Sequence, residues 1–363
     1  MPWLGPLLTA GSAAIGRLVA VNLAPSAILA VTVWLAVRAD AFTSTNLRPG
    51  DVFASFPLDA GGVLIFVLLV FGLAILLQPF DIHAVRLLEG YWSGTRLGAA
   101  VANVAAVRHR RRFQFIEDGL DAADKSVEDA LVGDSDLPGL PIEEQARRHR
   151  DWSEAKRKAG LARRWRPLYP PSKDEVMPTM LGNVLRAAER RAGERYHLPT
   201  VESLPRLHQH FSDRMAAAYN AAVDALDAAA MMTLSTALAC VVSVVAYFDD
   251  AAMYWLPIGL GVASLLSYRG AIVAAAQHGL FMETAFDLHR FDLIKALHLD
   301  LPRDADEERT IGERLHEFWK CVDVDDARDE WEGVKYWHYD ETLRPAENSY
   351  PPDDKGASPG RYL

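Results

Sequence analysis

The sequence contains only two cysteines, Cys240 and Cys321, which lie far apart in an apolar run and in a charged tail. Two such residues cannot build a disulfide framework, and their spacing fits no zinc site. Thiols that stay reduced are typical of proteins inside cells. We therefore expect neither disulfide bonds nor a cysteine-based metal centre.

Motifs that carry enzyme chemistry are also missing. The sequence has no glycine-rich phosphate loop, no nucleophile elbow and no recognisable frame of paired catalytic carboxylates. His208 and His210 are two residues apart, so on a helix they would point to different sides and could not share a metal ion. We expect no cofactor, and no pattern favours an enzyme.

An acidic run at residues 323–332 has too little in common with a calcium-binding loop to predict one. Arg328 stands where the loop needs its turn glycine, and Val334 stands where it needs a bidentate acid. The pattern favours a solvated acidic helix face.

Long apolar runs are what the sequence has in abundance. About 20 apolar residues in a helix cross the hydrocarbon core of a bilayer. Four runs reach this length, at residues 18–37, 62–80, 228–248 and 253–276. Residues 63–77 include no charge and no polar face, unlike a helix in a soluble core. The sequence thus predicts an all-α polytopic membrane protein with four transmembrane helices in two hairpins.

Arginines near the ends of these runs indicate the orientation. Arg86, Arg96 and the cluster at 108–112 follow the second run, whereas the turn between the last two runs holds Asp249 and Asp250 and no cation. The positive-inside rule places the basic sides and both termini in the cytoplasm. Because arginine greatly outnumbers lysine and alanine is abundant, as in GC-rich bacterial genomes, we expect a bacterial cell (inner) membrane.

The runs divide the chain into four predicted parts. These are an N-terminal transmembrane hairpin (1–80), a helical cytoplasmic domain (81–226), a C-terminal transmembrane hairpin (227–276) and a cytoplasmic helical tail (277–363), disordered from about residue 345. Pro79 is expected to bend a helix that continues to about residue 118. Thr179 is expected to cap a helix in which Gly182 allows close backbone approach.

Charged residues at the inner ends of the runs form a candidate intramembrane site. Arg269 lies near the inner end of the fourth run, and Asp224 and Asp227 share one helix face at the start of the third. We predict that Arg269 pairs with one of these aspartates. Arg269 could instead reach up to the lipid headgroups, or line a charged pathway in an oligomer.

Two further sets of residues indicate helix packing and lipid contact. Small residues recur every four positions along the fourth run and predict a packing ridge, within one subunit or between subunits: Gly259, Ala263, Ser267, Ala271 and Ala275. A basic cluster beside the membrane predicts contact with anionic lipid headgroups: Arg108, Arg110, Arg111 and Arg112. Acids mixed with the basic residues of 143–166 argue against nucleic-acid binding.

Three sequence blocks carry a family resemblance: QPFDIHAVRLLEGYW, LGNVLRAAERR followed by ERYHL, and AFDLHRFDLIKALHLDLP followed by DEER. They resemble recurrent blocks of uncharacterised actinobacterial multi-pass membrane proteins, a resemblance that implies no particular activity. The order of two spans, a helical insert, two spans and a tail also resembles the topology of bestrophin-type anion channels. No pore residue follows from that likeness.

These patterns lead to two functional hypotheses. One is a homo-oligomeric membrane protein, an ion channel controlled by its cytoplasmic helical domain. The other is a non-conducting anchor or scaffold that recruits a soluble cytoplasmic partner. The expected partners are the lipid bilayer, further copies of the chain and, for the scaffold, that soluble protein.

Overall fold

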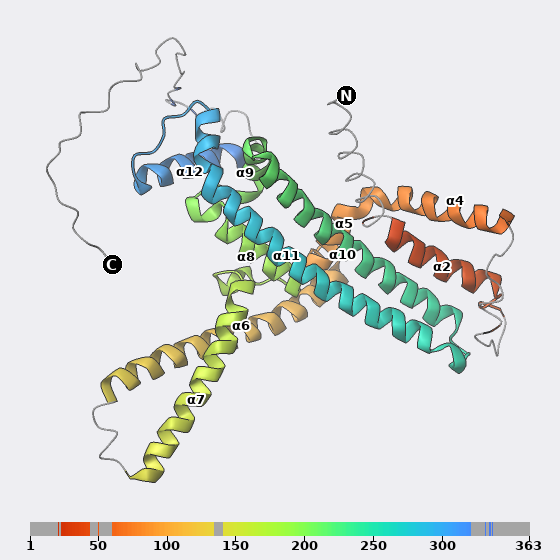
Figure 1. The fold of residues 1–363 in the computed structure, drawn as a ribbon, viewed down its shortest axis with the longest axis horizontal. Coiled ribbons are helices and arrows are strands. Elements are labelled where there is room, and N and C mark those ends of the chain that lie inside the picture. The colour runs from red at the N-terminus through yellow and green to blue at the C-terminus, as the bar shows by residue number, and fades with distance from the viewer. Residues whose placement is uncertain are drawn as a thin grey trace. The chain divides into compact units, whose positions relative to one another are not determined.

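The computed structural model describes residues 21, 23–43, 50, 60–133, 141–320, 331, 334 and 336. Within these ranges the regular structure is entirely helical (Figure 1), which confirms the predicted all-α class. The chain divides into two compact units, Met1–Arg290 and Phe291–Leu363. The disorder predicted from about residue 345 lies outside the described residues.

Three helical rods are long and apolar enough to cross a membrane. The first is α4 (Ala60–Leu77), which continues through a short 3-10 turn, η2 (Gln78–Phe80), into α5 (Asp81–Glu89). The others are α10 (Asp213–Ala246) and α11 (Trp255–Ala296). Because α4 is uncharged and exposed along nearly its whole length, its stability requires apolar surroundings.

The first predicted run forms a shorter helix. α2 (Ala24–Arg38) has 15 residues, and the beginning of the run, at 18–20, lies outside the described residues. Among the described residues there are therefore three helices of spanning length and one shorter apolar helix.

These helices pack together in the first unit. α2 packs along α10. Val21, just before α2, shares a buried cluster with Met231 of α10, and Leu35 of α2 shares another with Tyr247, just after α10. α10 and α11 run side by side (Figure 1), and the Ser264 hydroxyl donates a hydrogen bond of 3.0 Å to the carbonyl of Thr233. The two predicted hairpins thus contact each other through α2 and α10.

The helix predicted to continue from Pro79 to about residue 118 is interrupted, so that prediction was wrong. α5 ends at Glu89, and Gly90 has a φ of +101°, a left-handed conformation that glycine adopts readily. Pro178 lies 3.0 Å from where a Cβ on Gly90 would be. The chain therefore turns, and a new helix, α6 (Arg96–Gly133), begins.

Two long helices then form an antiparallel hairpin. α6 packs on α7 (Ile142–Trp165) through buried Phe113, Ile116 and Ala162. Short elements follow: η4 (Arg166–Leu168), η5 (Lys173–Glu175), α8 (Met180–Arg191), η6 (Glu194–Tyr196), α9 (Thr200–Leu207) and η7 (His208–His210). Ser212 caps α10 by accepting a hydrogen bond from the backbone N–H of Met215.

Close approach of α8 and α11 depends on Gly279. A Cβ added to Gly279 would lie 2.5 Å from the Cβ of Ala188, whereas a Cβ on Gly270 of the same helix would meet nothing within 4 Å. We expect Gly279→Ala to destabilise the protein by about 1–2 kcal/mol, a drop in Tm of about 1–3 °C. Gly270→Ala is the control and should leave Tm unchanged or raise it, because alanine favours helix. Thermal unfolding in detergent measures both, and equal Tm values would contradict the packing.

The second unit contains α12 (Ala305–Lys320). The Asp304 carboxylate caps this helix, as its sequence position predicts, by accepting hydrogen bonds from the backbone N–H groups of Asp306 at 3.0 Å and Glu307 at 2.9 Å.

Candidate functional site

Helix α8 begins directly against the end of α5. The Thr179 hydroxyl accepts a hydrogen bond from the Gly182 N–H at 3.0 Å and donates one to the Glu89 carbonyl at 2.8 Å. An added Cβ on Gly182 would lie only 2.2 Å from that carbonyl oxygen. The cap and the close approach predicted for this segment are therefore confirmed, and both serve the contact with α5.

Asn183 fixes the turn that leads into α8. Its side chain is fully buried. Its Nδ2 donates to the carbonyls of Met177 at 3.0 Å and Thr179 at 2.6 Å, and its Oδ1 accepts from the Met177 N–H at 2.9 Å. One amide thus satisfies both backbone groups of Met177, a half-buried residue.

The opposite side of α8 contacts α11. The Leu181 N–H donates to the Tyr268 hydroxyl at 3.3 Å, and Leu181 and Val184 share a buried cluster with Ala271 and Ala275 of α11. The short helix α8 is therefore bonded at once to α5, which continues from α4, and to α11. We name this contact region of α5, α8 and α11 the junction.

Ion pairs surround the exposed face of the junction. Arg190 donates from Nε to Glu175 at 2.7 Å and also pairs with Glu194, while Arg191 donates from Nε to Glu283 of α11 at 2.7 Å. Single half-exposed pairs contribute at most about 1 kcal/mol. Together these ion pairs fix the orientation of α8 relative to α11.

One glutamate inside this network is held in surroundings that disfavour charge. Burial raises the pKa of Glu189, although a hydrogen bond of 3.0 Å from Arg186 opposes this shift. The junction therefore holds a carboxyl group that gains stability from protonation.

The structure places the predicted intramembrane residues on two neighbouring helices. Arg269 is exposed on α11, and Asp224 and Asp227 are half-buried on α10. Their pairing stays a prediction. Of the small-residue ridge, Ala271 and Ala275 are fully buried beside α8, whereas Gly259 is exposed at the other end of α11.

The four arginines predicted to contact lipid separate on α6. The Arg112 guanidinium lies 4.2 Å from the centre of the Trp165 ring, and the Arg110 side chain is half-buried. Arg108 and Arg111 are exposed. Lipid contact by these residues stays a prediction.

Histidines gather where α10 and α11 leave the apolar part of the bundle. The His208 ring packs on Phe211 and Tyr219, and His278 packs on Tyr219. No cluster of three or more metal-binding side chains occurs among the described residues. The acidic run at 323–332 lies almost entirely outside them, since Trp331 alone is described there.

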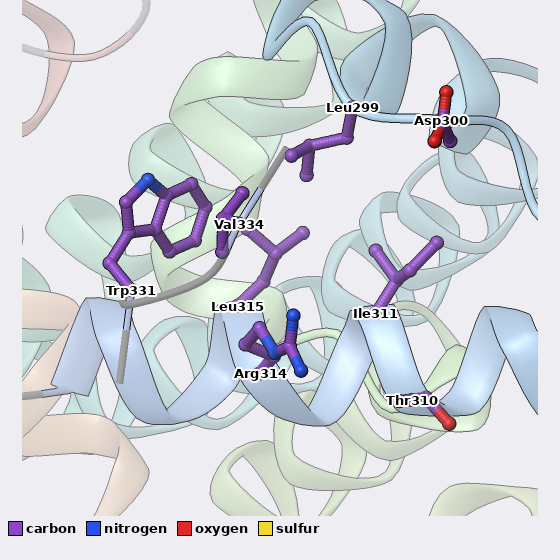
Figure 2. Close-up of a pocket in the computed structure, with 8 residues that line it drawn as sticks. All are labelled: Leu299, Asp300, Thr310, Ile311, Arg314, Leu315, Trp331 and Val334. Atoms are coloured by element: carbon purple, nitrogen blue, oxygen red, sulfur yellow. The ribbon is translucent and has the colours of Figure 1, made fainter. Parts of the chain in front are cut away.

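The second unit has an open apolar cavity of about 250 Å³. Figure 2 shows Leu299, Leu315, Trp331 and Val334 turned toward one another around it. Its remaining lining is Asp300, Thr310, Ile311 and Arg314. No sequence pattern predicted this cavity, because residues from three separate segments form it.

Comparisons with known proteins found no relative: no protein-family model, no curated protein and no solved structure matches the chain. The family resemblance carried by the three sequence blocks is thus still a prediction. The structure does bring the first two blocks together, since Val85 and Leu88 pack beside Leu181. The second and third blocks meet where Arg195 pairs with Asp287.

Proposed function

We propose that this chain is a homo-oligomeric membrane protein of the bacterial cell membrane, with four spans and cytoplasmic termini, that conducts ions under control of its cytoplasmic helices. The observation that carries the proposal is the junction. The short helix α8 contacts two rods. The Thr179–Glu89 hydrogen bond joins it to the rod that continues from α4. The hydrogen bond to Tyr268 and the Arg191–Glu283 pair join it to α11. A displacement of α8 would move both hairpins together.

Exposed residues on the long helices support the proposals that the chain forms oligomers and that it conducts ions. Only Ala74 of α4 is buried within the chain, so this helix has free faces for lipid and for further copies. Arg269 offers an exposed cation on α11. Ionisable groups at membrane depth often mark ion routes.

Recording from purified protein in planar bilayers tests conduction. We expect discrete current steps, and we expect Arg269→Gln to shift the reversal potential in a salt gradient. Arg163→Gln, an exposed arginine on α7, should not shift it. Bilayers that stay silent at several pH values would reject the channel.

A non-conducting scaffold is the second candidate, and the cavity of the second unit favours it. An open pocket with a tryptophan and aliphatic walls can receive an apolar side chain of a soluble protein. Purification from native membranes should then yield a stoichiometric soluble partner, which Leu315→Asp releases. Recovery of the chain without such a partner would reject the scaffold.

A further inference from the structure

Helix α6 carries a narrow stripe of exposed residues along one side. The stripe recurs at alternating steps of four and three residues, which keeps it on a single helix face: Leu97, Val101, Val104, Arg108, Arg111 and Phe115. Leu97 is 77% exposed, Val104 is 74% exposed and Phe115 is 66% exposed. Exposed apolar side chains in such a row mark an interaction surface.

Within the part of the chain that the structure describes, no other element covers this stripe. α6 packs on α7 through a different side, on which Phe113 and Ile116 are buried. Arg112 also turns to that side and stacks on Trp165. Of the basic cluster, Arg108 and Arg111 are the members that belong to the stripe.

The charge of this half of α6 has one sign. Residues 96–116 include five arginines and no acidic residue. A partner that covers the stripe must therefore combine an apolar layer with negative charge. Two identical stripes packed in parallel would instead place Arg108 and Arg111 against their own copies, which is unfavourable.

The surface of an anionic bilayer combines an apolar layer with negative charge, and a short connection keeps α6 near the membrane. Only residues 78–95 separate the end of α4 from the start of α6, and Leu87 and Tyr91 in this connection are exposed as well. Amphipathic helices with arginines beside an apolar stripe bind anionic membranes in this way.

We propose that the first half of α6 lies on the cytoplasmic membrane surface, with Leu97, Val101 and Val104 among the acyl chains and Arg108 and Arg111 on anionic headgroups. This inference goes beyond the proposed function, because it needs only that the chain is inserted in a membrane. It applies equally to a channel and to a scaffold.

A nitroxide spin label on Val104→Cys tests the proposal in the full-length protein, with Cys240 and Cys321 replaced by serine. The protein is placed in nanodiscs of phosphatidylcholine, with or without phosphatidylglycerol. We expect the label to be more accessible to oxygen, which concentrates in lipid, than to a water-soluble nickel chelate, and this preference should increase with phosphatidylglycerol. A label on Asp151→Cys of α7, also exposed, is the control and should favour the nickel chelate.

The variant R108E/R111E should lose the response to phosphatidylglycerol at Val104, since its stripe then repels the headgroups. Nickel access at Val104 equal to that at Asp151 would overturn the proposal. Dipolar broadening of the Val104 spectrum that disappears on dilution with unlabelled protein would also overturn it, because a second copy would then cover the stripe. Mass measurement of the same discs gives the copy number, so failure of the oligomer is distinguished from failure of lipid contact.

Discussion

Replacing Gly182 with alanine is expected to lower the free energy of unfolding by about 1–3 kcal/mol. The new methyl group would lie 2.2 Å from the Glu89 carbonyl oxygen, a backbone atom that cannot move away unless α5 and α8 separate. Separation breaks the 2.8 Å hydrogen bond between Thr179 and that carbonyl. Overpacking costs about 1–3 kcal/mol and a lost hydrogen bond about 1 kcal/mol, against a gain of about 1 kcal/mol from helix propensity.

Thermal unfolding in detergent measures this effect as a drop in Tm of about 1–4 °C. Gly160→Ala is the matched control, since Gly160 is also within a helix and a Cβ there meets nothing within 4 Å. It should raise Tm slightly or leave it unchanged. If both variants unfold at the same temperature, α8 does not contact α5 as described.

Asn183→Ala is expected to have a similar effect through unsatisfied hydrogen bonds. The substitution leaves the N–H and carbonyl of Met177 without the side-chain partners they have now. The carbonyl of Thr179 keeps the backbone N–H of residue 183 as a donor at 3.1 Å. Each buried orphan costs about 1–3 kcal/mol, so we expect a loss of about 3 kcal/mol.

Two comparisons make the Asn183 result specific. Asn103→Ala changes an exposed asparagine of α6 and should alter stability by less than about 0.5 kcal/mol. Asn183→Asp keeps the acceptor atom but buries a carboxylate next to carbonyl groups, so it should be at least as destabilising as alanine. A stable Asn183→Asp variant would show that this side chain is not buried in its hydrogen-bonded turn.

Local chemistry explains which parts of the junction could be predicted from the sequence. A threonine before an apolar run caps a helix by its own short-range geometry, so Thr179 was recognisable. Gly182 was recognisable as a position for close approach, because a glycine inside a helix is otherwise unfavourable. The partner, the carbonyl of Glu89, is 93 residues earlier in the chain, and no local pattern identifies it.

Long-range packing explains what the sequence did not reveal. The break at Gly90 follows from the left-handed backbone there and from Pro178, which comes from a distant segment. The helical periodicity on both sides of Gly90 favoured one continuous helix.

The length of α6 gives the break at Gly90 a mechanical consequence. With 38 residues and a rise of 1.5 Å per residue, the helix is about 57 Å long. A rotation of only about 5° about its first residue would displace its last residue by roughly 5 Å. Small rotations near Gly90 would thus become large displacements at the end of α6, where a pair of fluorescent dyes could report them.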